Sequence, residues 1–167
     1  MTCCVTGHRP QGFPFPYSPS SPAFLRYRAD LFAAVDALYR EGVTHFITGM
    51  ALGVDLDFAE AVLALKCEHP EILLEAAIPC PDQCKKWRKE DIERYERILA
   101  SCNEKRVLSP FYTPHCMHAR NQYMVNKADR VLGIWNGEKK GGTHATLLYA
   151  HQKGKRIQLL RLERYLT

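Results

Sequence analysis

The sequence predicts an α/β fold in which a mainly parallel sheet carries helices on both faces. Short apolar segments typical of strands alternate along the chain with longer segments whose apolar residues recur at helical spacing. Such repeated alternation favours a parallel sheet of the Rossmann-like class. The chain has 167 residues, 46% of them hydrophobic and 25% charged, which is ordinary for a globular protein. We therefore expect one Rossmann-like domain over residues 1–167.

The first half begins with an apolar strand over residues 3–6, which ends at Gly7. A proline-rich stretch over residues 9–22 follows, where prolines exclude a helix and favour a loop that could close over a ligand as a lid. Apolar residues then recur at helical spacing over residues 23–39, and Gly42 ends this helix. The remaining elements predicted in this half are strands over residues 44–49 and 72–79 and a helix over residues 54–68.

The second half continues the alternation of helices and strands. Residues 83–101 have the pattern of one long amphipathic helix, and Gly154 ends the last helix. The other helices are predicted over residues 118–129 and 143–153, and the strands over residues 105–109, 130–135 and 156–162.

Hydropathy and charge argue against a membrane protein and against a dedicated nucleic-acid binder. No apolar run approaches the roughly 20 residues of a membrane span, and the N-terminus lacks the pattern of a signal peptide. We therefore expect a cytoplasmic protein without a membrane partner. The net charge of +5 is a modest bias toward anionic partners, and the basic residues are scattered, so nucleic acid ranks last among the expected partners.

The seven cysteines are odd in number and irregularly spaced, which favours reduced thiols over a disulfide framework. Cys80 and Cys84 have further metal-ligand types downstream at His115, Cys116 and His118. A zinc site usually shows a tighter knuckle and a second pair with clear spacing. We therefore expect no metal site.

Three loops with unusual residues should meet at one edge of the sheet. They cover residues 6–9, 48–55 and 141–143, and each follows a predicted strand. The carboxyl ends of parallel strands gather at one edge, where ligands bind. Glycines at a helix start let unpaired backbone N–H groups approach an anion, which the helix dipole also favours. A pair of glycines before a helix is also common in loops that bind nothing.

Individual side chains in these loops have two interpretations each. Asp55 is either the N-cap of its helix or an acceptor for ribose hydroxyls. Thr48 is a ligand contact or only a strand-end hydroxyl, and His8 is a ligand contact, an acid–base group or neither. Arg120 shares a helix face with apolar residues, so it either forms an internal salt bridge or clamps a phosphate at the ligand edge.

Five blocks of sequence resemble the YpsA-like family of the SLOG superfamily. They are TGHRP, ITGMALGVDLDFAE, AIPCPDQCKKW, MHARNQYMVNKAD and WNGEKKGGTHATLLYA, and the similarity runs from about residue 3 to about residue 160. The resemblance implies a Rossmann-like fold related to the LOG phosphoribohydrolases and to DprA. It also implies a nucleotide-derived ligand such as NAD or ADP-ribose, and it allows a homodimer.

The catalytic residues of the LOG enzymes are only partly matched. Their helix carries an Arg-Lys pair, whereas Arg120 is followed here by Asn121, and their catalytic glutamate is replaced by apolar or aromatic residues over 147–149. Glycosidic cleavage needs a carboxylate or an equivalent group. Asp55, Asp57 or Glu60 would have to supply it, so the catalytic residues are unknown, with Asp55 and Glu60 as candidates.

We therefore expect a protein that binds a nucleotide or nucleotide-derived ligand, such as NAD or ADP-ribose, as a sensor or regulatory module. It needs no cofactor beyond that nucleotide. A nucleotide N-glycosidase is the first alternative, and a single-stranded DNA-binding protein is the second. The expected ligand-binding residues are Thr6, Gly7, His8, Arg9, Thr48, Gly49, Gly53, Asp55, Arg120, Asn121, Gly141, Gly142 and Thr143.

Overall fold

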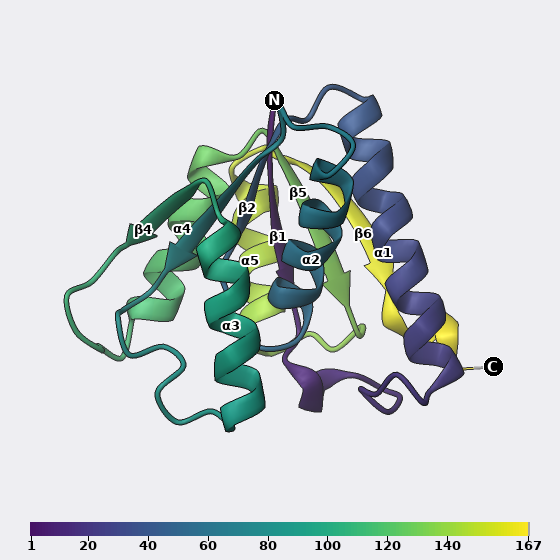
Figure 1. Ribbon diagram of the computed structural model, residues 1–167, viewed down its shortest axis with the longest axis horizontal. Helices are drawn as coiled ribbons and strands as arrows, with labels where there is room; N and C mark the ends of the chain where they lie inside the picture. The colour runs from purple at the N-terminus through teal and green to yellow at the C-terminus, as the bar shows by residue number, and fades with distance from the viewer. Residues whose placement is uncertain (167) are drawn as a thin grey trace.

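Six strands form one parallel sheet in a computed structural model that describes residues 1–166 (Figure 1). The strand order across the sheet is β4-β3-β2-β1-β5-β6. The strands are β1 (Thr2–Gly7), β2 (His45–Thr48), β3 (Leu73–Ile78), β4 (Glu104–Val107), β5 (Arg130–Trp135) and β6 (Arg156–Arg161). The expected α/β fold with a Rossmann-like parallel sheet is therefore confirmed.

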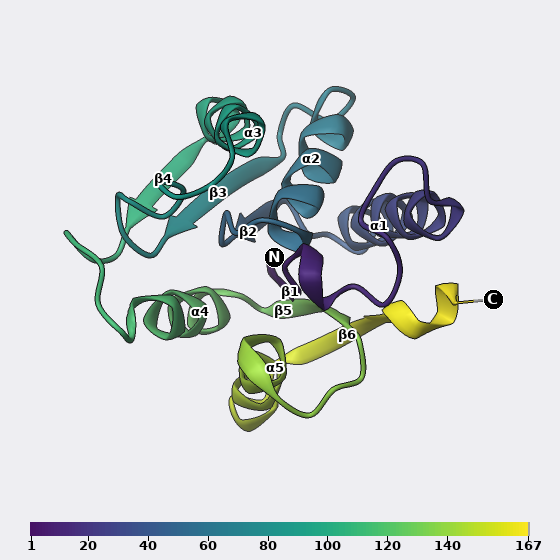
Figure 2. The same cartoon turned by 90° about the horizontal axis from the view of Figure 1, so that it is seen from below.

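Helices cover both faces of the sheet, as the view onto one edge shows (Figure 2). On one face lie α1 (Pro22–Arg40), α2 (Val54–Lys66) and α3 (Lys89–Ser101). On the other face lie α4 (Cys116–Lys127) and α5 (Gly141–Gln152). Two short 3-10 helices, η1 (Pro10–Gly12) and η2 (Leu162–Tyr165), complete the described elements. Within residues 1–166, no helix has both the length and the apolar character needed to cross a membrane.

The core has two parts because the central strands are buried on both faces. In β1, Cys3 and Val5 pack into the larger cluster under α1 to α3, whereas Cys4 packs into the smaller cluster under α4 and α5. In β5, Leu132 likewise belongs to the larger cluster and Val131 to the smaller one. Successive side chains of a strand point to opposite faces, so a strand buried on both sides is a continuous apolar run.

The proline-rich stretch is anchored in this core and does not have the structure of a lid. Phe13 and Phe15 are buried, and their rings meet the buried ring of Tyr27 on α1. Tyr17 donates a 2.7 Å hydrogen bond to Asp57 on α2. Lifting this segment would expose aromatic core and break the hydrogen bond to Asp57, so the stretch does not act as the expected lid.

The helix expected over residues 83–101 begins only at Lys89. Arg88 before it is extended, with φ −65° and ψ 155°, and the preceding residues form turns. Gln83 is buried there, and its side chain donates a 2.9 Å hydrogen bond to the carbonyl of Gly49. This contact with a distant loop holds the segment out of the helix, and helical spacing alone did not reveal it.

The order of the strands places a crevice above β1 and β5. The chain runs outward from β1 to β4 and then returns to the other side of β1 with β5. The loops that leave β1 and β5 therefore lead to opposite faces of the sheet. Ligands of open parallel sheets bind at this reversal, beyond the carboxyl ends of the strands.

Candidate functional site

A cavity of about 300 Å³ lies at this reversal, on the edge of the sheet that Figure 2 views. Its wall comes from the end of β1, the loop into α2, the first turns of α4 and the N-terminus of α5. The residues that line it are Val5, Thr6, Gly7, His8, Arg9, Ala51, Asp55, Met117, Arg120, Asn121, Gly142 and Thr143.

The cavity brings together most of the residues expected to hold a ligand. Four of the expected residues do not line it, namely Thr48, Gly49, Gly53 and Gly141. Sequence reasoning missed Val5, Ala51 and Met117, whose apolar side chains gave no signal of a site. The binding role of every residue in this wall stays a prediction.

Arg120 lines the cavity and is only 5% exposed. Its Nη1 donates to the carbonyl of Gly49, and its Nε donates to Asn121 Oδ1 at 2.7 Å. Asn121, which stands where LOG enzymes have a lysine, therefore orients the guanidinium. No carboxylate of residues 1–166 forms an ion pair with Arg120. The internal salt bridge is thus not the role of this side chain.

Burial and a neighbouring positive charge both disfavour the charged form of Arg120. Burial lowers the pKa of the guanidinium, the negative charge of Asp55 opposes this, and the positive charge of Arg9 adds to the lowering. Arginine nevertheless remains protonated in proteins. A bound anion would relieve the repulsion between the two guanidinium groups.

Asp55 is the one acidic side chain among the residues that line the cavity, and it is 8% exposed. It does not cap its helix, because the N-cap of α2 is Gly53 and no side chain caps that end. Its Oδ2 instead accepts a 3.2 Å hydrogen bond from the backbone N–H of Ala51. Burial raises the pKa of Asp55, although Arg120 and the Ala51 N–H oppose the rise. The N-cap interpretation is therefore wrong.

Gly49, Gly53 and Thr48 shape the wall from behind. A Cβ on Gly49 would lie 2.7 Å from both Arg120 Nη1 and Asp55 Oδ2, so only glycine leaves room for these two groups. Gly53 has φ +91°, which favours glycine. Thr48 is fully buried, and its hydroxyl donates a 2.8 Å hydrogen bond to the Asp55 carbonyl. These residues position the site and do not face the cavity.

The N-terminus of α5 is open toward the cavity. Its N-cap, Lys140, makes no side-chain capping hydrogen bond. Gly142 and Thr143, in the first turn, line the cavity, and a Cβ added to Gly142 would meet no atom within 4 Å. Backbone N–H groups at such an end lack partners within the helix, and the helix dipole favours an anion there.

His8 joins the loops that follow β1 and β5. Its Nε2 accepts a 3.1 Å hydrogen bond from the backbone N–H of Asn136, which requires a neutral ring with the proton on Nδ1. Burial lowers the pKa of His8, against a smaller opposing effect of Glu138. The neutral ring therefore acts as a fixed part of the wall, with Nε2 unavailable for proton transfer.

The model of the YspA SLOG family matches residues 3–164. The chain belongs to the YspA SLOG family. Curated relatives agree with this assignment. The UPF0398 protein of Bacillus pumilus is 28% identical over 139 residues, covering 82% of this chain and 74% of the relative. The SPbeta prophage-derived protein YoqJ of Bacillus subtilis is 30% identical over 155 residues, covering 85% of this chain and 90% of that protein.

For some relatives the matched segment covers less than two thirds of the relative's own length. The UPF0398 protein YpsA of Bacillus subtilis is 31% identical over 107 residues, which cover 63% of this chain and 59% of YpsA. What such longer proteins do as a whole therefore does not transfer directly to this chain.

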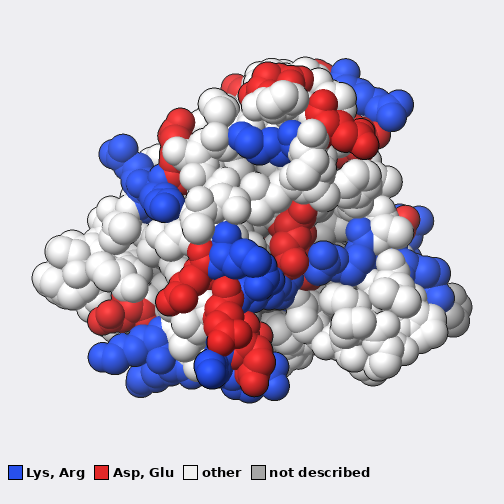
Figure 3. Space-filling model, viewed as in Figure 1, with Lys and Arg blue, Asp and Glu red and all other residues white. Residues whose placement is uncertain are grey.

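A solved structure shares the fold of this family member. It is DNA processing protein A from Helicobacter pylori, described by its single-stranded DNA binding mode, with a TM-score of 0.64 and 18% identity. The match covers 95% of this chain and 64% of that one. At this identity the likeness shows a shared fold. On the face shown in Figure 3, Lys and Arg lie interleaved with Asp and Glu and form no continuous basic stripe.

Glu60 lies outside the cavity, in an ion-pair network between α1, α2 and α3. Its Oε1 accepts a 2.8 Å hydrogen bond from Arg94 Nε. Arg94 also contacts Asp57, which is fully buried and further bonded to Arg28. Glu60 is therefore not a catalytic candidate, because its carboxylate pairs with Arg94 outside the cavity. The same holds for Asp57.

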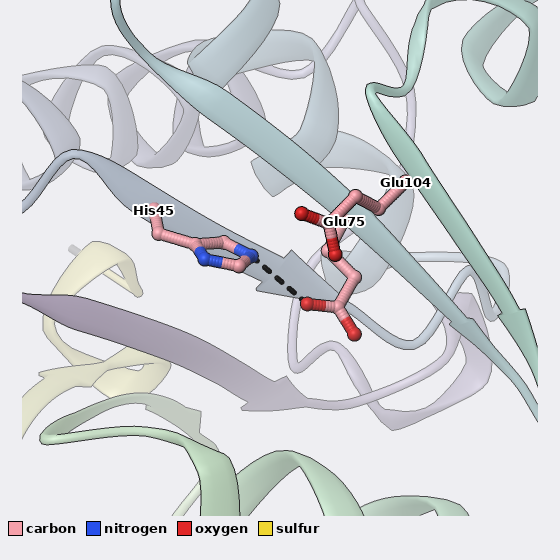
Figure 4. Close-up of side chains that lie close together, drawn as sticks. All are labelled: His45, Glu75 and Glu104. Carbon is pink, nitrogen blue, oxygen red and sulfur yellow. Dashed lines mark hydrogen bonds and ion pairs between the residues drawn. The ribbon is translucent and has the colours of Figure 1, made fainter.

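One group of side chains elsewhere in residues 1–166 has the spacing of a metal site. Figure 4 shows its members, His45, Glu75 and Glu104, whose ligand atoms lie within 4.8 Å of one another. Lys127 already supplies the positive charge there, because its Nζ lies 2.7 Å from Glu75 Oε2 and 3.7 Å from Glu104 Oε2. An ammonium thus stands where a cation would bind, and the group does not fit a metal.

Proposed function

We propose that the protein binds the phosphates of a nucleotide-derived ligand, of the NAD or ADP-ribose kind, and acts as a sensor or regulatory module. One observation carries the proposal. The uncapped N-terminus of α5 and the buried guanidinium of Arg120 face the same cavity at the strand-order reversal. Both are elements that stabilise a phosphate, the first through backbone N–H groups and the second through bidentate hydrogen bonds.

The other residues of the wall complete this assignment. Thr143 offers a hydroxyl beside the helix end, and Thr6 and Arg9 close the opposite side. Asp55 accepts hydrogen bonds from ribose hydroxyls, as acidic residues do in many nucleotide sites. Arg9 and Arg120 bring two positive charges to the cavity and Asp55 one negative charge, so an anionic ligand offsets the excess positive charge.

Gly142→Ala tests the proposal without disturbing the fold. The added methyl meets no protein atom, and alanine favours a helix more than glycine does, so thermal stability should be unchanged or slightly higher. The methyl should instead obstruct a phosphate at the helix end. Losing one hydrogen bond to a charged group costs about 1.5–3 kcal/mol, which lowers affinity roughly 10- to 150-fold.

Calorimetric titration with ADP-ribose, NAD and AMP measures the effect. Gln152→Ala, at the far end of the same helix, is the matched control and should bind as the wild type does. Wild-type affinity in Gly142→Ala would contradict the assignment of phosphate to this helix end. The absence of binding by any of these nucleotides to the wild-type protein would refute the proposed function.

An enzymatic function is a second candidate, and the setting of Asp55 favours it. A buried carboxylate with a raised pKa beside an arginine is typical of acid–base sites. Asp55 would then act in a nucleotide N-glycosidase. Base release from a nucleotide panel that is abolished in Asp55→Asn would support this candidate. The absence of release at high enzyme concentration would oppose it.

Binding of single-stranded DNA is a third candidate, supported by the fold of the DNA-processing neighbour. Exposed aromatic rings at Phe111 and Tyr112, 66% and 64% exposed, offer surfaces on which bases can stack. Binding through phosphates must weaken steeply as salt rises, because counterions are released. An oligonucleotide affinity that is insensitive to salt would remove this candidate.

A further inference from the structure

A second cavity, of about 470 Å³, opens on the same edge of the sheet beside the first. It lies between the segment that follows β3 and the loop that precedes α4. Its wall includes two aromatic rings, Trp87 and Tyr112, and two exposed lysines, Lys85 and Lys86. No residue that lines it has a role in the proposed phosphate site except Met117, which lines both cavities.

The two cavities share a wall. Met117 lines both cavities, and the carbonyl of Gly49 links one lining residue of each. That one oxygen accepts hydrogen bonds from Arg120 in the wall of the first cavity and from Gln83 in the wall of the second. Because Met117 lines both cavities, a ligand with its phosphates in the first cavity has this second space directly beside it.

The chemistry of the second cavity suits a planar base. Trp87 is half-buried, and Tyr95 holds its ring edge-to-face with centroids 5.4 Å apart at 88°. Tyr95 is itself buried and hydrogen-bonded to Gln83 at 3.3 Å. The indole is thus set in place by packing before any ligand arrives. Such a preset ring offers a stacking surface for a nucleobase.

We infer that the second cavity is a nucleobase subsite, in which a base stacks on Trp87 while its phosphates occupy the first cavity. The inference rests on the proposed function, which it deepens by assigning the base. It predicts that compounds with both a base and phosphates bind more tightly than phosphates alone. The expected gain is roughly 5- to 150-fold, the range for one stacked base.

Tryptophan fluorescence can follow the base directly. The chain has two tryptophans, so Trp135→Phe leaves Trp87 as the single emitter. We expect ADP-ribose to quench this emission and inorganic pyrophosphate to bind without quenching it. Binding of ADP-ribose without quenching would overturn the inference and leave the proposed phosphate site in place.

Affinities measured on variants give an independent test. In Trp87→Leu the ratio of ADP-ribose affinity to pyrophosphate affinity should fall toward one, and Trp135→Phe is the matched control in which the ratio stays as in the wild type. Tyr112→Ala, at an exposed position, serves where loss of the indole unfolds the protein, and its ratio should fall severalfold. An unchanged ratio in Trp87→Leu and in Tyr112→Ala would overturn the inference.

Failure of the proposed function gives a different pattern. If neither pyrophosphate nor ADP-ribose binds the wild-type protein, the proposed function and the shared subsite both fall. If a short oligothymidylate alone binds and quenches Trp87, the base subsite stands and the ligand is single-stranded DNA.

Discussion

Glu75 offers a test of the structure that depends on pH. Its carboxylate is 1% exposed in the middle of β3 and accepts hydrogen bonds from Tyr123 at 2.6 Å and Lys127 at 2.7 Å, with His45 at 2.9 Å. Burial alone would raise the pKa, but the hydrogen bonds from His45, Lys127 and Tyr123 outweigh it and lower the pKa of Glu75 from 4.5 to about 2. Glu75→Gln removes the charge and keeps the shape.

The pKa gives the size and the pH range of the effect. The difference between 4.5 and about 2, at about 1.36 kcal/mol per pH unit, corresponds to roughly 3 kcal/mol of stability. Because the folded-state pKa is lowered, this stability is present in full above pH 4.5 and is lost as the pH falls toward 2. Glu75→Gln should therefore be less stable than the wild type by roughly 3 kcal/mol at pH 7, and by less than about 1 kcal/mol near pH 2.

Urea unfolding followed by circular dichroism at several pH values from 7 to 2 measures this difference. Glu104→Gln is the matched control, because Glu104 lies 3.7 Å from the same ammonium but is half exposed. Its cost should stay under about 1 kcal/mol at every pH. A difference between wild type and Glu75→Gln that does not change from pH 7 to pH 3 would refute the reasoning.

Other substitutions test the packing that holds the site. Asp57→Asn should cost about 3–5 kcal/mol in urea unfolding, because it removes the charge of a fully buried carboxylate that pairs with Arg28 and Arg94. Asp36→Asn, in an exposed pair on α1, should cost under about 0.5 kcal/mol. Gly53→Ala should lower the melting temperature and weaken ligand binding, because residue 53 has φ +91° and its Cβ would lie 2.4 Å from the His8 carbonyl oxygen. Phe46→Ala, in the centre of β2, should cost about 3–5 kcal/mol, and a cost below about 1 kcal/mol would contradict its placement in the core.

The order of strands and helices was predictable because both faces of the sheet are buried. The apolar run over residues 131–135 fits a strand covered on two sides, and β5 (Arg130–Trp135) includes these residues. The segment before α3 was not predictable, since its helical spacing is overridden by the bond from Gln83 to a loop distant in sequence. Local patterns report propensity, and contacts distant in sequence decide such cases.

The location of the candidate site was predictable, but which of its polar side chains face the cavity was not. The parallel sheet required the loops after β1, β2 and β5 to meet, so Thr6, Asp55 and Gly142 were expected together and do line one cavity. Thr48 carries the same kind of signal as these residues, yet its hydroxyl is bonded to the backbone behind the wall. Which polar side chain faces a cavity depends on the directions of strand and helix ends, which residue types do not specify.

The backbone at Gly49 imposes a rule on how this site can vary among related sequences. Any side chain at residue 49 would start 2.7 Å from the guanidinium of Arg120 and from the carboxylate of Asp55. A relative with alanine or a larger residue at this position must therefore lack the arginine or the aspartate, or hold them elsewhere. A side chain at residue 49 is therefore expected only together with a change at residue 55 or 120, or with a shift of one of those two side chains.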